Sequence, residues 1–177
     1  GGFDSWLGYE NNNAQWDCWV HGHDFTGEET PLYRLPAYET DALTDRFIAF
    51  LNDRGAERTR NPETPFFAVL SVQPPHAPYN DVPDEYRSLF HSDSLSLRPN
   101  VGETNWDGSD SNAVRQWLAG YYAHIALLDD QFARLISALD ELGVSDETIV
   151  VYTSDHGDML GSHGMTKKQL PFEEAIR

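Results

Sequence analysis

Two polar clusters in this 177-residue chain combine residue types that do chemistry, and each directly follows a short apolar run. The first cluster runs from Gln73 to Tyr79 around His76, and the second is Ser154-Asp155-His156-Gly157-Asp158. A carboxylate and an imidazole in adjacent positions can bind one cation, and a following glycine lets the backbone turn sharply. A rigidly held histidine suits an anionic oxygen. The two clusters therefore indicate a site that joins a cation to an anionic substrate.

Each of these residues also has a purely structural explanation. Asp155 can cap a turn while His156 faces solvent, and His76 can be incidental in a rigid, proline-flanked turn. Lys168 can supply a point charge to an anionic substrate, although most surface lysines are only solvated. The apolar run in front of Asp155 and the lysine pair that follows it favour the chemical interpretation.

The apolar runs that precede the two clusters are predicted to be strands buried on both faces. They are Phe66–Val72 and Thr148–Thr153, and continuous apolar runs of this length are typical of parallel strands. Open parallel sheets bind ligands beyond the carboxyl ends of their strands. We therefore expect His76 and Asp155 to approach one another at one edge of a sheet.

A long helix is predicted between the two clusters. Apolar residues recur at alternating spacings of three and four from about Asn112 to Leu142, and Gly143 follows as the residue that stops the helix. The helix leads through a short turn into the run at 148–153, which is the order of an α/β unit. We expect its apolar stripe to pack on the parallel sheet.

The rest of the chain predicts shorter elements and loops. A helix is expected over 40–54, with Thr40 as its N-cap and Gly55 at its end. Residues 83–90 and the last residues from Pro171 predict short helical segments. The segments 1–35 and 91–111 are rich in turn-forming residues and predict loops.

The fold class predicted from these elements is α/β, with a mostly parallel sheet sandwiched by helices. Two doubly buried strands cannot cover one another, and such sheets have several strands with helices on both faces. The sheet is therefore incomplete in this chain. We expect residues 1–177 to be part of a single catalytic domain, with other strands of its sheet outside this sequence.

Composition and charge limit the classes of partner. The chain has 12 Lys and Arg against 29 Asp and Glu, giving a net charge of −17. A field of this sign repels phosphate backbones and anionic lipids, and no run of 18 apolar residues occurs. We expect neither a nucleic acid nor a membrane as partner. The composition assigns no cellular compartment.

Other candidate residues have simpler interpretations. Cys18 is the single cysteine, which excludes an internal disulfide and a multi-cysteine zinc site, and it is expected to be a packed thiol. His21-Gly22-His23 has metal-binding spacing but no evident third ligand. Trp16, Trp19 and Trp106 fit a sugar-stacking platform or, more commonly, buried packing.

Several motifs together resemble the sulfatase family of the alkaline phosphatase superfamily. One is Val69-Leu70-Ser71-Val72-Gln73-Pro74-Pro75-His76-Ala77-Pro78-Tyr79. Others are Tyr121-Tyr122-Ala123, Asp155-His156-Gly157-Asp158-Met159-Leu160-Gly161-Ser162-His163-Gly164 and the final segment from Pro171. The start, Gly2-Phe3-Asp4 with Trp6 and Gly8-Tyr9, is also similar to the family. The resemblance therefore covers nearly the whole chain.

The resemblance implies a metal-dependent sulfuric-ester hydrolase acting on a sulfated small molecule or carbohydrate. It implies Asp155 and His156 as ligands of a divalent cation, usually Ca²⁺, although an imidazole suits Mn²⁺ equally. It further implies that His76 contacts the sulfate or helps the leaving oxygen, and that Lys168 binds the sulfate. Lys167 is the neighbour of Lys168, and the resemblance implies no role for it.

The chain departs from the family pattern at the nucleophile. The family converts the Cys or Ser of a Cys/Ser-x-Pro-Ser-Arg motif into formylglycine, and no such string occurs in this sequence. Cys18 lacks this context. The paired aspartates that complete the family's metal site, and its C-terminal subdomain, are also missing from the sequence. Formylglycine is therefore expected in a segment outside this chain.

Two other functions remain open. A phosphonate or phosphodiester hydrolase of the same superfamily binds a similar tetrahedral anion, and its nucleophile segment would distinguish it from a sulfatase. A catalytically inactive binding protein is an interpretation from a different class.

Overall fold

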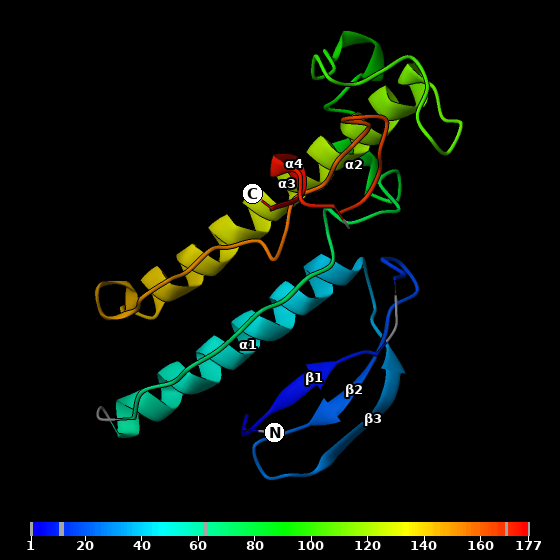
Figure 1. Cartoon of the computed structure of the whole chain (residues 1–177). Helices are drawn as coiled ribbons and strands as arrows, with labels where there is room; N and C mark the ends of the chain where they lie inside the picture. Colours follow the sequence, from blue (N-terminus) through cyan, green and yellow to red (C-terminus); the bar gives the residue numbers. More distant parts are fainter. Residues whose placement is uncertain (1, 11–12, 62–63, 169, 177) are drawn as a thin grey trace.

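The computed structural model describes residues 2–10, 13–61, 64–168 and 170–176. Along the chain these residues form a small sheet, two long helices joined by irregular segments, and several short helical turns (Figure 1). The elements are β1 (Trp6–Gly8), β2 (Trp19–His23), β3 (Glu29–Arg34), α1 (Glu39–Arg60), α2 (Asp84–Arg87), η1 (Ser92–Ser94), α3 (Ser111–Glu141), η2 (Ser145–Glu147) and α4 (Glu173–Ile176).

The N-terminal region is a three-stranded antiparallel sheet in the order β1-β2-β3, so the loop predicted for residues 1–35 is wrong. Buried Val20 faces inward between exposed Trp19 and half-buried His21, an alternation typical of a sheet with one solvated face. Gly22 lets β1 approach β2, because a Cβ there would lie 1.9 Å from the carbonyl oxygen of Trp6. The strands are only three to six residues long, β1 and β2 each contain a glycine and β3 contains Pro31, so their sequences lack the clear alternation that predicts a strand.

Helix α1 is longer than predicted. Its N-cap is Tyr38 rather than Thr40, and the backbone N–H of Glu39 donates to the carbonyl of Gln15. Gly55 lies inside the helix instead of ending it. A Cβ at Gly55 would lie 2.6 Å from a methyl group of Leu142, so this glycine provides a close contact with the segment after α3.

Helix α3 confirms the long helix predicted from about Asn112. Asp110 caps its start, accepting hydrogen bonds from the backbone N–H groups of Asn112 and Ala113. Gly143, with a φ of +67°, follows its end in the left-handed conformation that glycine adopts without strain.

Helix α1 lies between the sheet and α3 (Figure 1). On one side, Ala42 and Leu43 of α1 pack against the inner face of the sheet around Val20. On the other side, Leu51 of α1 packs against Ala138 and Leu139 of α3. The predicted packing of α3 on a parallel sheet is therefore replaced, within the described residues, by packing on a helix.

The two predicted parallel strands are extended segments without strand pairing in the described part of the chain. Residues 66–72 run alongside α1, and residues 148–153 run alongside α3 (Figure 1). Ring contacts such as Phe50–Phe66 and Phe132–Tyr152 join each segment to its helix. Phe67 is 78% exposed and Ile149 is 93% exposed. Because a strand requires a partner's backbone to complete its hydrogen bonds, an apolar run alone does not make one. The predicted fold class, α/β with both helices and sheet, is confirmed.

The short elements match their predictions more closely. The helix expected over 83–90 is α2, and α4 forms shortly after Pro171. The segment 91–111 is largely irregular, with one helical turn at η1 and an isolated bridge between Val101 and Ser162. None of the helices in the described residues has the length and apolar composition needed to cross a membrane.

Candidate active site

His76 lies in the loop that follows the extended segment 66–72, and its side chain is half-buried. Its Nδ1 lies 2.7 Å from the carbonyl oxygen of Ala77. Because a carbonyl can only accept, Nδ1 carries the proton in this contact, and in the neutral ring Nε2 presents a lone pair. The loop thus fixes one nitrogen of the ring and leaves the other for chemistry.

The side chain of Gln15 holds the backbone of this loop. The Gln15 side chain is fully buried, and its Nε2 donates to the carbonyl oxygen of His76 over 3.1 Å. Asn13 holds the next residue in the same way, donating from Nδ2 to the carbonyl of Ala77 over 3.2 Å. The segment between β1 and β2 therefore positions the His76 loop, a role that its sequence did not reveal.

Gln15 belongs to a buried network with Tyr38 and His124. The Tyr38 hydroxyl donates to Oε1 of Gln15 over 3.0 Å, and it lies 3.0 Å from Nδ1 of His124. Since Tyr38 gives its single proton to Gln15, the second bond takes its proton from His124 Nδ1. Burial lowers the pKa of His124 to about 4, against a smaller opposite effect from backbone contacts with Pro78 and Tyr79. His124 is therefore a neutral structural histidine.

A second buried group lies beside this network, at the start of α1. Glu39 is fully buried and accepts a hydrogen bond of 2.5 Å from the Tyr9 hydroxyl. Burial raises the pKa of Glu39, while hydrogen bonds from Tyr9 and the Gln73 backbone act in the opposite direction. Because Gln73 precedes His76 by three residues, this carboxyl group also holds the loop.

Asp155 and His156 lie side by side in the loop that follows residues 148–153. Nε2 of His156 is 3.3 Å from Oδ2 of Asp155, and Nδ1 of His156 is 2.8 Å from the carbonyl oxygen of Gly157. The Gly157 carbonyl fixes Nδ1 as the donor, so in the neutral ring Nε2 carries the lone pair and lies close to a carboxylate oxygen. Two electron donors this close to one another suit a shared cation, which fits the predicted ligand roles.

The described residues supply only part of a metal site. Asp155 is exposed, with 85% of its side chain accessible, and His156 is half-buried. No group of three or more His, Cys, Asp or Glu side chains in the described residues is arranged to hold a metal ion. The His21-Gly22-His23 pair likewise has no third ligand among them.

Lys168 lies in the same loop region as Asp155, and its side chain is half-buried. The backbone of Lys167 beside it is fixed, since its carbonyl accepts from the N–H of Met159 over 2.8 Å. Within the described part of the chain, the Lys168 ammonium makes no hydrogen bond or ion pair. It is a cation near the Asp155 loop without a protein counter-ion there.

The structure joins the two predicted loops through residues that were not predicted. The Tyr79 hydroxyl donates to Oδ2 of Asp158 over 2.7 Å. Arg98 donates to the carbonyls of Asp158 and Met159 and to the Ser162 hydroxyl. Among the described residues no hydrogen bond or ion pair links His76 directly to Asp155, His156 or Lys168, so their approach at one edge stays a prediction.

Two further predictions can be compared with the structure. Cys18 is fully buried in the cluster beneath the sheet, as expected of a packed thiol. The prediction that the three tryptophans are buried is wrong. Trp16, Trp19 and Trp106 are all exposed, and the exposed fraction of Trp106 is 81%.

The chain matches the family described as Sulfatase over residues 1–177. It is 32% identical to an ulvan-active sulfatase of Formosa agariphila over 99% of this chain and 32% of that protein. It is 34% identical to an arylsulfatase of Clostridium perfringens over 82% of this chain and 32% of that protein. The chain thus spans about a third of the length of these relatives.

Two solved structures are also similar to the chain. The yidJ protein of Bacteroides fragilis, a candidate sulfatase, superimposes with a TM-score of 0.83 at 28% identity over 99% of this chain and 37% of that one. A phosphonate monoester hydrolase of Agrobacterium radiobacter superimposes with a TM-score of 0.62 at 26% identity. That match covers 77% of this chain and 31% of the hydrolase.

Proposed function

The chain belongs to the sulfatase family, and from this premise we propose that it forms part of a metal-dependent enzyme that hydrolyses sulfuric esters. The observation that carries the proposal is the family match across residues 1–177. The substrate class is a sulfated small molecule or carbohydrate. Several relatives carry names that specify a sulfated carbohydrate, including an N-acetylglucosamine-6-O-sulfatase of Bacteroides thetaiotaomicron.

Asp155 and His156 are the proposed ligands of the divalent cation. The closeness of their donor atoms, Oδ2 and Nε2, supports this role because a bound cation would share the electrons of both. The oxygen ligand suits Ca²⁺ and the imidazole suits Mn²⁺. When bound, the cation would act as a Lewis acid toward the sulfate oxygens.

His76 and Lys168 are the proposed contacts of the sulfate. The Ala77 carbonyl holds Nδ1 of His76, so Nε2 is the atom that can exchange a proton with a sulfate or leaving-group oxygen. Lys168 offers an ammonium with no protein counter-ion among the described residues, which supports a role in binding an anion. Both side chains are half-buried, so water reaches them less freely than it reaches exposed groups.

The nucleophile is proposed to be a formylglycine outside this sequence. Cys18 does not qualify, because its thiol is fully buried under the sheet and an attacking group must reach the substrate. The residues of this chain would then bind the metal and orient the anion, while the nucleophile comes from elsewhere in the protein.

A phosphonate or phosphodiester hydrolase is the second candidate function, and the similarity to the phosphonate monoester hydrolase of Agrobacterium radiobacter favours it. A sulfate monoester and a phosphonate monoester both present tetrahedral oxyanions. The proposed anion-binding groups, His76 and Lys168, suit either one. An inactive binding protein is the third candidate.

The test uses the natural protein that contains this sequence. It is stripped of metal, reloaded with Ca²⁺ or Mn²⁺, and assayed with a chromogenic aryl sulfate and a chromogenic phosphonate monoester. We expect metal-dependent hydrolysis with a higher kcat/KM for the sulfate. A higher kcat/KM for the phosphonate would favour the second function, and turnover of neither probe nor of a sulfated oligosaccharide would favour the inactive protein.

A further inference from the structure

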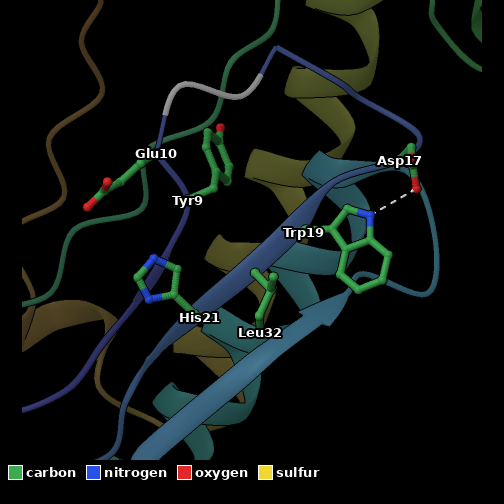
Figure 2. Close-up of a pocket in the computed structure, with 6 residues that line it drawn as sticks. All are labelled: Tyr9, Glu10, Asp17, Trp19, His21 and Leu32. Atoms are coloured by element: carbon green, nitrogen blue, oxygen red, sulfur yellow. Dashed lines mark hydrogen bonds between the residues drawn. The ribbon is translucent and has the colours of Figure 1, made fainter.

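The outer face of the N-terminal sheet carries a hollow that none of the proposed catalytic groups uses. Trp19 and His21 of β2 point away from the core, opposite to buried Val20, and Leu32 of β3 lies beside them. The hollow has a volume of about 300 Å³. Figure 2 shows the side chains that line it, which are Tyr9, Glu10, Asp17, Trp19, His21 and Leu32.

The indole of Trp19 is held in one orientation although 45% of the residue is exposed. Its Nε1 donates to Oδ1 of Asp17 over 3.2 Å, drawn as a dashed line in Figure 2. The same oxygen lies 2.6 Å from Nε of Arg34, whose Nη2 donates to the carbonyl of Trp16. A flat apolar surface fixed in this way loses little rotamer entropy when a ligand covers it.

The charges around the hollow exclude one class of ligand. Glu10 and Asp17 are both exposed carboxylates on its lining, and the whole chain carries a net charge of −17. A sulfate or phosphate placed here would be repelled. An uncharged ring with an apolar face and several hydroxyl groups fits better, since the face can lie on the indole and the hydroxyls can donate to the carboxylates.

The hollow is connected to the His76 loop by the segment between β1 and β2. Tyr9 lines the hollow, and its hydroxyl donates to Glu39, which also accepts from the backbone of Gln73. Gln15 from the same segment holds the carbonyl of His76. Tyr9 and Gln15 therefore tie the hollow and the His76 loop to the same part of the chain.

We propose that the hollow at Trp19 binds an uncharged sugar ring of a carbohydrate whose sulfate group is bound beside His76. This inference rests on the proposed function and specifies its substrate class as a sulfated oligosaccharide or polysaccharide. An aryl sulfate has no sugar ring to place in the hollow, so Trp19 contributes to the selection of the longer substrate.

The kinetic test compares two substrates in the natural protein that contains this sequence. The probes are a chromogenic aryl sulfate and oligosaccharides prepared from ulvan and from chondroitin sulfate. We expect Trp19→Ala to lower the ratio of kcat/KM for the preferred oligosaccharide to that for the aryl sulfate by about tenfold. Trp19→Tyr should restore part of the ratio, because it keeps an aromatic face.

Trp106→Ala is the matched control, because Trp106 is an exposed tryptophan that lies against Gly164 and does not line the hollow. It should leave the ratio unchanged. An unchanged ratio of the two kcat/KM values in Trp19→Ala, including an equal fall for both substrates, would overturn the inference.

A binding measurement separates this inference from the proposed function. Isothermal titration of the same oligosaccharides into the wild type, Trp19→Ala and Trp106→Ala requires no turnover. Weaker binding in Trp19→Ala alone supports the sugar site even if the protein hydrolyses no sulfate ester. Equal binding in all three proteins rejects the site even if the protein is a sulfatase.

Discussion

The hydroxyl of Tyr79 donates a hydrogen bond of 2.7 Å to the carboxylate of Asp158, and this bond joins the His76 loop to the Asp155 loop. The two loops follow segments that are about 80 residues apart in the sequence, since the hydrogen bond spans 79 positions. Burial and the hydrogen bond to Asp158 raise the pKa of the Tyr79 phenol, which therefore stays protonated and able to donate. The relative position of the two candidate loops thus depends on a residue that takes no part in the proposed chemistry.

Replacement of Tyr79 by Phe should lower the free energy of unfolding by about 1 kcal/mol, because the ring stays packed and only one hydrogen bond is lost. Urea denaturation measures the change. Tyr122→Phe is the control, since the Tyr122 hydroxyl makes no hydrogen bond among the described residues. An equal loss in both variants would mean that the bond to Asp158 contributes nothing specific.

Protonation of His124 should destabilise the protein in mild acid. Its folded-state pKa of about 4 lies below the ordinary value of 6.5, so the unfolded state binds more protons between these two values. The His124 contribution to stability is present above the unfolded pKa and is lost as pH falls through the folded pKa, to a limit of about 3 kcal/mol.

The measurement is urea denaturation at a series of pH values for the wild type and His124→Gln. Glu39 titrates with the opposite sign, because burial raises its pKa and favours stability at low pH. Its contribution is present in both proteins and cancels in their difference. We expect the wild type to lose more stability than the variant between about pH 7 and pH 5. Parallel curves would show that His124 does not titrate in this range.

Asp155→Ala and Lys168→Ala should affect activity in different ways. Loss of a ligand carboxylate should remove bound metal and metal-dependent turnover, whereas loss of the lysine should raise KM by about tenfold or more. Metal content by atomic emission and steady-state kinetics distinguish the two effects. Asp93→Ala and Lys167→Ala are the controls, since both side chains are exposed. Wild-type metal content in the Asp155 variant would remove it from the ligands.

The 177-residue chain alone should hydrolyse no aryl sulfate at a rate typical of enzymes. Its candidate groups can position an anion and part of a metal shell, but none of them is a suitable nucleophile for sulfur. The assay uses the purified chain with a chromogenic aryl sulfate and Ca²⁺ or Mn²⁺. Metal-dependent turnover would show that the chemistry does not require a formylglycine from another segment.

Helix α3 was predictable from the sequence, because the spacing of its apolar residues and the stop at Gly143 lie within the helix or next to it. The same kind of local signal located α1 but misplaced its ends, since Tyr38 caps it and Gly55 lies inside it. Candidate ligands could also be named, since Asp155 and His156 are adjacent in the chain. Adjacent residues remain close in any fold.

Only the tertiary structure decided which distant segments meet. The sequence could not predict that Gln15 holds His76, because the hydrogen bond spans 61 positions and Gln15 has no local pattern to identify it. The same limit applies to the strands: β1, β2 and β3 pair although their sequences read as loops, while residues 148–153 read as a strand and have no pairing among the described residues. A helix completes its hydrogen bonds within itself, whereas a strand completes them with a partner that its own sequence does not specify.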